Sequence, residues 1–127
     1  MKRVISTTAA PGAVGPYSQA IEANGFVFVS GQLPLDPATG AFVSDNTAEQ
    51  AEQCIKNLLA VLSAAGCTAE DVVKATVYMI DIGDFGAVNE VYGRYFTGAC
   101  PARCAMQAGA LPKGALVEIE AIAAKPQ

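Results

Sequence analysis

Histidine and tryptophan are absent from the 127-residue chain, and charged residues make up only 16% of it. Without histidine, Ser-His and Cys-His catalysis and every metal site with an imidazole ligand are excluded. The four cysteines stand at positions 54, 67, 100 and 104 and form no C-x-x-C pair, so we interpret them as reduced thiols. Any chemistry must use acidic side chains, tyrosine, cysteine, lysine, arginine, backbone groups and water.

Long apolar runs and clustered basic residues are missing as well. No stretch approaches the roughly 18 apolar residues of a membrane span, and Ser6-Thr7-Thr8 and Pro11-Gly12 interrupt any signal-peptide pattern. The net charge is −4, and Lys2-Arg3 is the only adjacent pair among eight basic residues. Binding to a nucleic-acid backbone relies on clustered Lys and Arg and is therefore disfavoured. We expect a cytoplasmic protein without a membrane partner.

Apolar residues are what the chain has in excess, at 52% of the total. Its length fits one domain spanning 1–127. A domain of this size has much surface for its volume, and burial between subunits would accommodate the surplus of apolar side chains. The composition therefore favours an oligomer.

The apolar periodicity predicts six strands and two helices in the order β-ββ-α-β-α-ββ. The strands are expected near residues 2–6, 17–22, 26–31, 72–80, 102–108 and 116–124, and the helices over 47–66 and 84–96. Asn24-Gly25 predicts a tight hairpin turn, and Thr47-x-x-Gln50 can form a capping box. This order is typical of an α+β fold with both helices on one face of a mixed sheet. The opposite face, also apolar, would be bare in a monomer, and three such sheets could close on one another.

The last predicted strand contains two carboxylates in an otherwise apolar run. Strand alternation places Glu118 and Glu120 on one face, and Val117, Ile119 and Ala121 on the other. They belong either to a solvated edge face or to a cleft in which one of them pairs with a cation. Arg103, on the preceding predicted strand, is the candidate partner, because its planar fork also suits a small carboxylate ligand.

Six ordered motifs span nearly the whole chain. They are Gly15-Pro16-Tyr17-Ser18-Gln19-Ala20, Val29-Ser30-Gly31-Gln32-Leu33-Pro34, Val88-Asn89-Glu90-Val91-Tyr92, Pro101-Ala102-Arg103, Leu111-Pro112-Lys113-Gly114 and Val117-Glu118-Ile119-Glu120-Ala121. In sequence and spacing they resemble the RidA (YjgF) family. The resemblance implies a chorismate-mutase-like fold and a homotrimer with three clefts between adjacent subunits.

The resemblance also implies an activity, which is the hydrolysis of 2-aminoacrylate, 2-iminopropanoate and 2-iminobutanoate to 2-oxo acids and ammonia. These reactive compounds leak from serine and threonine dehydratases. Arg103 is expected to hold the substrate carboxylate and Glu118 to position the hydrolytic water. The other residues expected around the cleft are Tyr17, Ser30, Gly31, Asn89 and Ala105. Positioning and acid–base catalysis suffice for an electrophilic imine, so neither a metal nor a cofactor is expected.

One position departs from the family pattern. Many bacterial relatives carry cysteine two residues after the arginine, where this chain has Ala105. Strand alternation should turn the neighbouring Cys104 away from Arg103 and into packing. Two other functions stay open at this point: a ligand-binding or holdase trimer without turnover, and an endoribonuclease or translation inhibitor.

Overall fold

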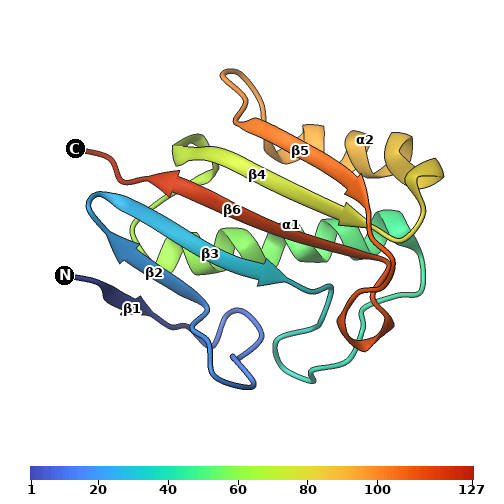
Figure 1. Ribbon diagram of the computed structural model, residues 1–127, viewed down its shortest axis with the longest axis horizontal. Coiled ribbons are helices and arrows are strands. Elements are labelled where there is room, and N and C mark those ends of the chain that lie inside the picture. Colours follow the sequence, from blue (N-terminus) through green and yellow to red (C-terminus); the bar gives the residue numbers. More distant parts are fainter.

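The computed structural model describes all 127 residues and contains one six-stranded mixed sheet in the order β1-β2-β3-β6-β4-β5 (Figure 1). Every neighbouring pair is antiparallel except β4 and β5, which are parallel. The strands are β1 (Arg3–Ile5), β2 (Ala20–Ala23), β3 (Phe26–Gln32), β4 (Val72–Met79), β5 (Ala102–Gln107) and β6 (Val117–Ala124). The helices are α1 (Thr47–Ala64) and α2 (Phe85–Tyr95), with short 3-10 turns η1 (Ala69–Asp71), η2 (Ile82–Asp84) and η3 (Pro112–Gly114). The predicted α+β order is confirmed.

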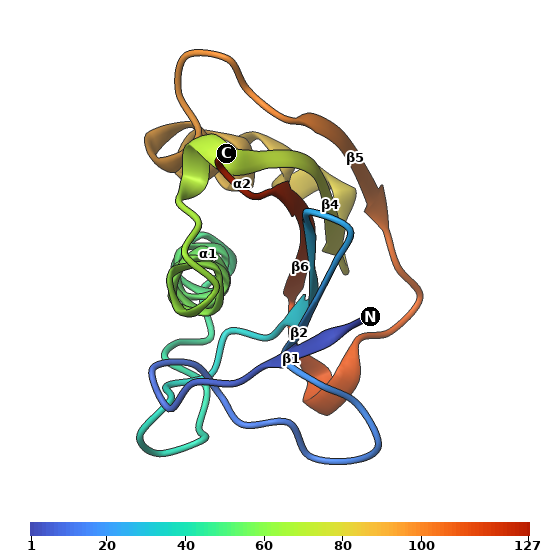
Figure 2. The same ribbon diagram turned by 90° about the vertical axis from the view of Figure 1, so that its left-hand side faces the viewer.

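Both helices cover the same face of the sheet, as Figure 2 shows with the sheet seen nearly edge-on. Apolar residues recur every three or four positions along α1 and form one buried stripe, which includes Cys54, Ile55, Leu58 and Leu62. This stripe packs against the sheet in a core of 25 buried residues. Each large aliphatic side chain buried there contributes roughly 1.5–3 kcal/mol. The core therefore fixes which side of every strand faces the helices.

The start of α1 differs from its predicted form. The N-cap is Asn46, whose side-chain oxygen accepts a hydrogen bond of 3.0 Å from the backbone N–H of Glu49. Gln50 does not close a capping box with Thr47. Its buried amide instead donates to Ser44 O and accepts from the backbone N–H of Leu116, at 2.9 Å each. The pattern Thr47-x-x-Gln50 was misread because Gln50 serves a long-range contact.

The predicted hairpin turn at Asn24-Gly25 is confirmed, with φ values of 52° and 81°. Both residues tolerate this left-handed conformation, which a type I′ turn requires. The strand before the turn is shorter than predicted, since β2 begins at Ala20 and Tyr17 lies in the preceding loop. That difference matters because it frees Tyr17 from the sheet.

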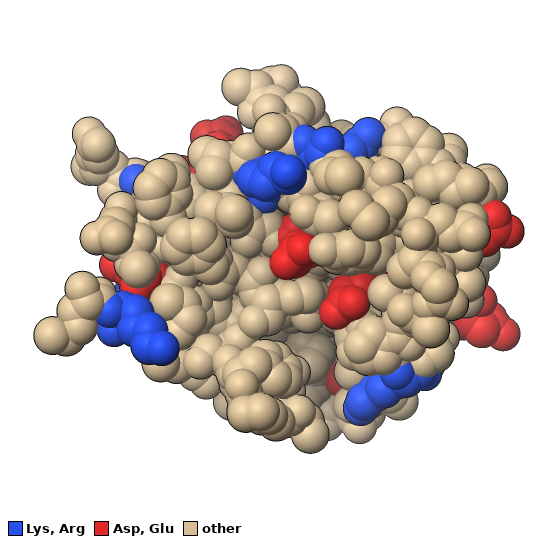
Figure 3. Space-filling view, viewed as in Figure 1, with Lys and Arg blue, Asp and Glu red and all other residues tan.

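The face of the sheet opposite the helices is uncovered in the single chain. Figure 3 shows this face, with acidic side chains near the middle of a largely uncharged surface. Its exposed apolar side chains include Phe26, Phe28 and Met106. We call it the open face. Neither helix is long and apolar enough to cross a membrane.

Candidate functional site

Glu118 and Glu120 both point to the open face from the middle of the sheet. Burial alternates along β6, with Val117, Ile119 and Ala121 buried and the two glutamates half-buried. β6 lies between β3 and β4, so the two glutamates lie in the middle of the sheet and not at its edge. Half-buried carboxylates on a central strand lose hydration, which must be compensated by partners or by protonation.

The two carboxylates have different surroundings. The Tyr78 hydroxyl donates a hydrogen bond of 2.5 Å to Glu120 Oε1. Burial raises the pKa of Glu118, and the charge of Glu120 raises it further. Glu118 is therefore the carboxyl whose proton is held more tightly than usual.

A cavity of about 630 Å³ opens beside these glutamates. Its walls come from the loop before β2, the end of β3, η3 and β6. Among the residues that line it are Tyr17, Ser30, Gly31, Lys113, Glu118 and Glu120. We call this group the carboxylate half-site. Four of the predicted site residues thus meet here, and Lys113 adds a cationic group to the wall.

Gly31 lets the Glu118 carboxylate lie directly on the backbone of β3. A Cβ at position 31 would overlap Glu118 Oε2 and lie 2.8 Å from its Cδ. No side chain fits there unless the carboxylate moves. The motif glycine therefore sets the position of Glu118, which gives it a physical role at the site.

Buried amides hold the loops of the cavity. Gln19 donates to the carbonyls of Thr7 and Pro11, at 3.0 and 2.8 Å, and so anchors the loop that carries Tyr17. Asn57 on α1 donates to the carbonyls of Leu33 and Leu35, at 2.9 Å each. These bonds satisfy backbone groups that would otherwise be buried without a partner.

Two of the predicted contact residues make bonds of their own. Ser30 Oγ donates to Ser18 O at 2.6 Å, so its side chain ties β3 to the same loop as Gln19. The Tyr17 hydroxyl accepts from the backbone N–H of Val14 at 3.4 Å, and the side chain is about half exposed. Tyr17 is therefore available to a ligand, whereas the Ser30 hydroxyl already has an acceptor.

Arg103 lies on the opposite face of the sheet from the carboxylate half-site. Its Nη1 donates to Asn89 Oδ1 at 2.7 Å, and its guanidinium lies 4.7 Å from the centre of the Tyr92 ring and 5.3 Å from that of Phe85. All three partners belong to α2. Such stacking on aromatic rings orients a guanidinium and leaves its other donors free.

Arg103 and Asn89 line a second cavity, of about 400 Å³, together with Tyr92 and Cys100. We call this group the arginine half-site. The Tyr92 hydroxyl is buried there without a hydrogen-bond partner. Sequence reasoning identified Arg103 and Asn89 but missed the support from Tyr92 and Phe85. Their helical spacing around Asn89 was visible, but the packing of that helix against the Arg103 strand was not.

The predicted Arg103–Glu118 pair does not form within one chain. β4 lies between β5 and β6, and Arg103 is registered with Ala75, which is buried on the helix side. Tyr78, which faces Glu118 in the register, belongs to the other side. The prediction that the strands of Arg103 and Glu118 are neighbours was wrong, because the loop that connects β5 to β6 crosses over β4.

Cys104 does point away from Arg103, as predicted. It is registered with Thr76 and, through it, with Glu120, so it shares the open face. It is exposed in the single chain and not packed, contrary to expectation. Ala105 lies on the Arg103 side, half-buried against the core, and lines neither half-site.

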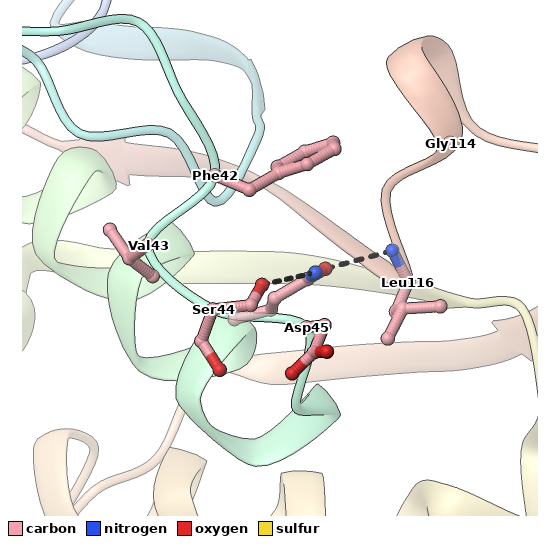
Figure 4. Close-up of a pocket in the computed structure, with 7 residues that line it drawn as sticks. Phe42, Val43, Ser44, Asp45, Gly114 and Leu116 are labelled. Atoms are coloured by element: carbon pink, nitrogen blue, oxygen red, sulfur yellow. Dashed lines mark hydrogen bonds between the residues drawn. The ribbon is translucent and has the colours of Figure 1, made fainter.

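A third cavity, of about 530 Å³, lies between the loop before α1 and η3 and contains no predicted site residue. Figure 4 shows Phe42 and Val43 on one side and Gly114 and Leu116 on the other. The Gln50 side chain joins the two sides through its bonds to Ser44 and Leu116. This link fixes the entry into β6, one residue before the strand of the two glutamates begins.

Comparison with known proteins shows the family to which the chain belongs. Residues 7–125 match the family described as endoribonuclease L-PSP. The chain belongs to this family, which is also known as YjgF/RidA. The resemblance of the sequence motifs to the RidA family is thereby confirmed.

Relatives cover almost the whole chain. A mouse protein named 2-iminobutanoate/2-iminopropanoate deaminase is 53% identical, over 97% of this chain and 91% of its own. A putative endoribonuclease from Thermotoga maritima has a crystal structure with a TM-score of 0.96 and 46% identity, covering 100% of both chains. The structure of Escherichia coli TdcF with bound serine has a TM-score of 0.93 and 39% identity, covering 98% of this chain and 99% of its own.

Proposed function

We propose that the chain is a cytoplasmic deaminase that hydrolyses 2-iminobutanoate, 2-iminopropanoate and the enamine 2-aminoacrylate to 2-oxo acids and ammonia. The observation that carries the proposal is the half-buried Glu118 carboxyl, which lies on Gly31 beside a cavity with its pKa raised by burial. The name of the mouse relative supports the same activity.

Glu118 is the acid–base group of the proposed reaction. Its carboxylate accepts a proton from a water molecule while the water oxygen bonds to the imine carbon. This proton passes to the nitrogen and gives a carbinolamine. Glu118 then transfers the hydroxyl proton to the nitrogen, so that the C=O bond forms as the C–N bond breaks and ammonia leaves. A carboxyl with a raised pKa suits both steps, because its pKa lies nearer to neutral pH than that of an ordinary carboxyl.

Arg103 is the proposed anchor for the substrate carboxylate. Asn89, Tyr92 and Phe85 hold the guanidinium in place, so little side-chain entropy is lost when the fork binds an anion. Tyr17, Ser30 and Gly31 complete the proposed substrate contacts from the carboxylate half-site. The backbone of Ala105 lines neither cavity within one chain, and it is proposed to contribute where two protomers meet. The serine bound to Escherichia coli TdcF supports recognition of small amino-acid-like carboxylates.

A homotrimer with clefts between subunits would bring the two half-sites together. Within one chain Arg103 and Glu118 lie on opposite faces of the sheet, so a cleft needs Arg103 from one protomer and Glu118 from another. The uncovered apolar open face, with Phe26, Phe28 and Met106 exposed, supports assembly through that face.

Coupled turnover tests the activity. The purified protein is added to a threonine dehydratase, and decay of the imine is followed against release of 2-oxo acid. We expect faster imine decay with wild-type protein and a loss of at least about 100-fold with Glu118→Gln. RNA cleavage and suppression of aggregation are measured on the same samples. Full imine decay in folded Glu118→Gln protein, or RNA cleavage without imine decay, would contradict the proposal.

Mixed trimers test the shared cleft. Arg103→Lys and Glu118→Gln protomers are dissociated, mixed in equal amounts and reassembled. In a ring with sites between neighbours, about one cleft in four then has both wild-type groups, so activity should return to about a quarter of the wild-type value. Each variant reassembled alone is the control. Mixed trimers without recovery would show that both groups come from one protomer.

A further inference from the structure

Tyr78 contacts the two glutamates of the carboxylate half-site unequally. Tyr78 and Glu118 are opposite each other in the β4–β6 register. The phenol nevertheless bonds to Glu120, two residues further along the same face, at 2.5 Å. A phenol has one hydrogen to donate, so only one of the two carboxylates can receive it.

The bond stabilises one carboxylate of the pair and not the other. A short O–H···O⁻ bond to a carboxylate is charge-assisted and favours the anion. The hydrogen bond to Glu120 raises the pKa of Tyr78 to about 12, so the phenol remains a donor throughout the working range of pH. Burial and the neighbouring charge of Glu120 are the two effects on Glu118, and both favour its protonated form.

The other titratable groups near Glu118 act on it less directly than Glu120 does. Tyr17 and Lys113 line the same cavity from the loops. Cys104 lies on β5 beyond Tyr78, and Cys54 lies on α1 behind β6, where burial keeps its thiol protonated. Glu120 is therefore the charge that acts most directly on Glu118.

We propose that Tyr78 is a positioning residue, whose single donor holds the carboxylate of Glu120 and so leaves Glu118, which has no such donor, to take up and release the proton. The catalytic value of this arrangement rests on the proposed deaminase function. The different roles of Glu118 and Glu120 can nevertheless be measured in the protein without substrate. Glu120 thus takes part in the chemistry without contact with the substrate.

Carbon-13 NMR titration of the glutamate carboxyl groups tests the proposal without substrate. Spectra of Glu118→Gln identify the Glu118 signal. In Tyr78→Phe, Glu120 loses its donor and competes for the proton, so the two glutamates should titrate as a coupled pair. The Glu120 signal should move to higher pH by about one unit, as expected for the loss of a charge-assisted bond, and the Glu118 signal should titrate in two steps. In Glu120→Gln the repelling charge is gone, and the pKa of Glu118 should fall.

Tyr95→Phe is the matched control. Tyr95 on α2 donates a similar bond of 2.9 Å to Glu52 on α1, and neither residue lines the cavity beside Glu118. Its loss should leave the Glu118 titration unchanged. The acidic limb of the pH profile of kcat should become broader in Tyr78→Phe and should move to lower pH in Glu120→Gln.

The titration tests the inference about Tyr78, and the turnover assay tests the proposed function, so one can be contradicted without the other. An unchanged Glu118 titration in folded Tyr78→Phe protein would overturn the inference, even if turnover is normal. If Tyr78→Phe does not fold, an unchanged Glu118 pKa in Glu120→Gln overturns it instead. The predicted titration shifts in a protein that hydrolyses no imine would support the division of roles and contradict the proposed function.

Discussion

The carboxylate of Glu118 occupies the space that a side chain at Gly31 would fill, on the neighbouring strand of the β3–β6 pair. The backbone of Gly31 does not need the left-handed conformation, because its φ is not positive. The glycine is required by the close approach of Glu118 and not by a turn. This relationship connects a motif on one strand with the proposed acid–base group on another.

Gly31→Ala should displace the Glu118 carboxylate and leave the fold intact. The overlapping atoms are the end of a flexible side chain, which can move at little cost to stability. A displaced acid–base group typically loses about 10–100-fold in rate. We expect a fall of this size in kcat for imine hydrolysis, with circular dichroism and Tm close to those of the wild type.

Gly86→Ala is the matched control, because a Cβ there meets no atom within 4 Å and the position lies in α2. Alanine in a helix is more favourable than glycine by roughly 0.5–1 kcal/mol. This variant should keep its activity and gain slightly in stability. Wild-type activity in Gly31→Ala would show that the position of the Glu118 carboxylate does not limit the reaction.

The sequence was sufficient where the signal is local. Alternation along 117–121 gave the face of each side chain on β6, and Asn24-Gly25 gave the hairpin turn, because both depend on neighbouring residues alone. The family motifs added the residues of both half-sites, which no local pattern could connect.

The contacts that were predicted wrongly or missed all join segments that are distant in the sequence. The placement of β4 between β5 and β6 decides that Arg103 and Glu118 lie on opposite faces, and no pattern near either residue encodes that crossover. Gln50 was misread for the same reason, since its partner Leu116 lies 66 positions away. The Tyr78–Glu120 bond was also missed, because it depends on the register between two strands.

Glu118→Gln should make the protein more stable at neutral pH while it removes activity. The pKa of Glu118 is raised in the folded protein, so its contribution to stability is present at low pH and is lost as the pH rises through that pKa. Glutamine carries no charge and avoids this loss. The Tm of the variant should exceed that of the wild type at pH 7, and the difference should vanish below about pH 4, where the carboxyl is protonated in both states.

The comparison is made by thermal unfolding at a fixed protein concentration, because assembly makes Tm depend on concentration. A Tm for Glu118→Gln below that of the wild type at pH 7 would mean that the ionised carboxylate is stabilised by a partner.

Thiol labelling should report whether the open face is covered. Cys54 and Cys67 are buried in the single chain, whereas Cys100 and Cys104 are exposed. If subunits assemble through the open face, Cys104 becomes protected and Cys100 stays accessible. Labelling of the native protein should then modify Cys100 rapidly and the other three thiols slowly, as peptide mass spectrometry can show. Equally rapid labelling of Cys100 and Cys104 in a sedimentation-verified trimer would exclude the open face as the interface.

Arg103→Lys should weaken the binding of small carboxylates more than it slows the chemistry. Lysine keeps the charge, but it cannot both donate to Asn89 and present two parallel N–H groups to a ligand. Loss of such a contact typically costs about 1.5–3 kcal/mol, which corresponds to roughly 10–100-fold in kcat/KM. Calorimetric titration with a 2-oxo acid should show a similar loss for Arg103→Lys, whereas Glu118→Gln should still bind it. Normal 2-oxo acid binding by folded Arg103→Lys would remove Arg103 as the carboxylate anchor and leave Lys113 as the remaining cation of the two half-sites.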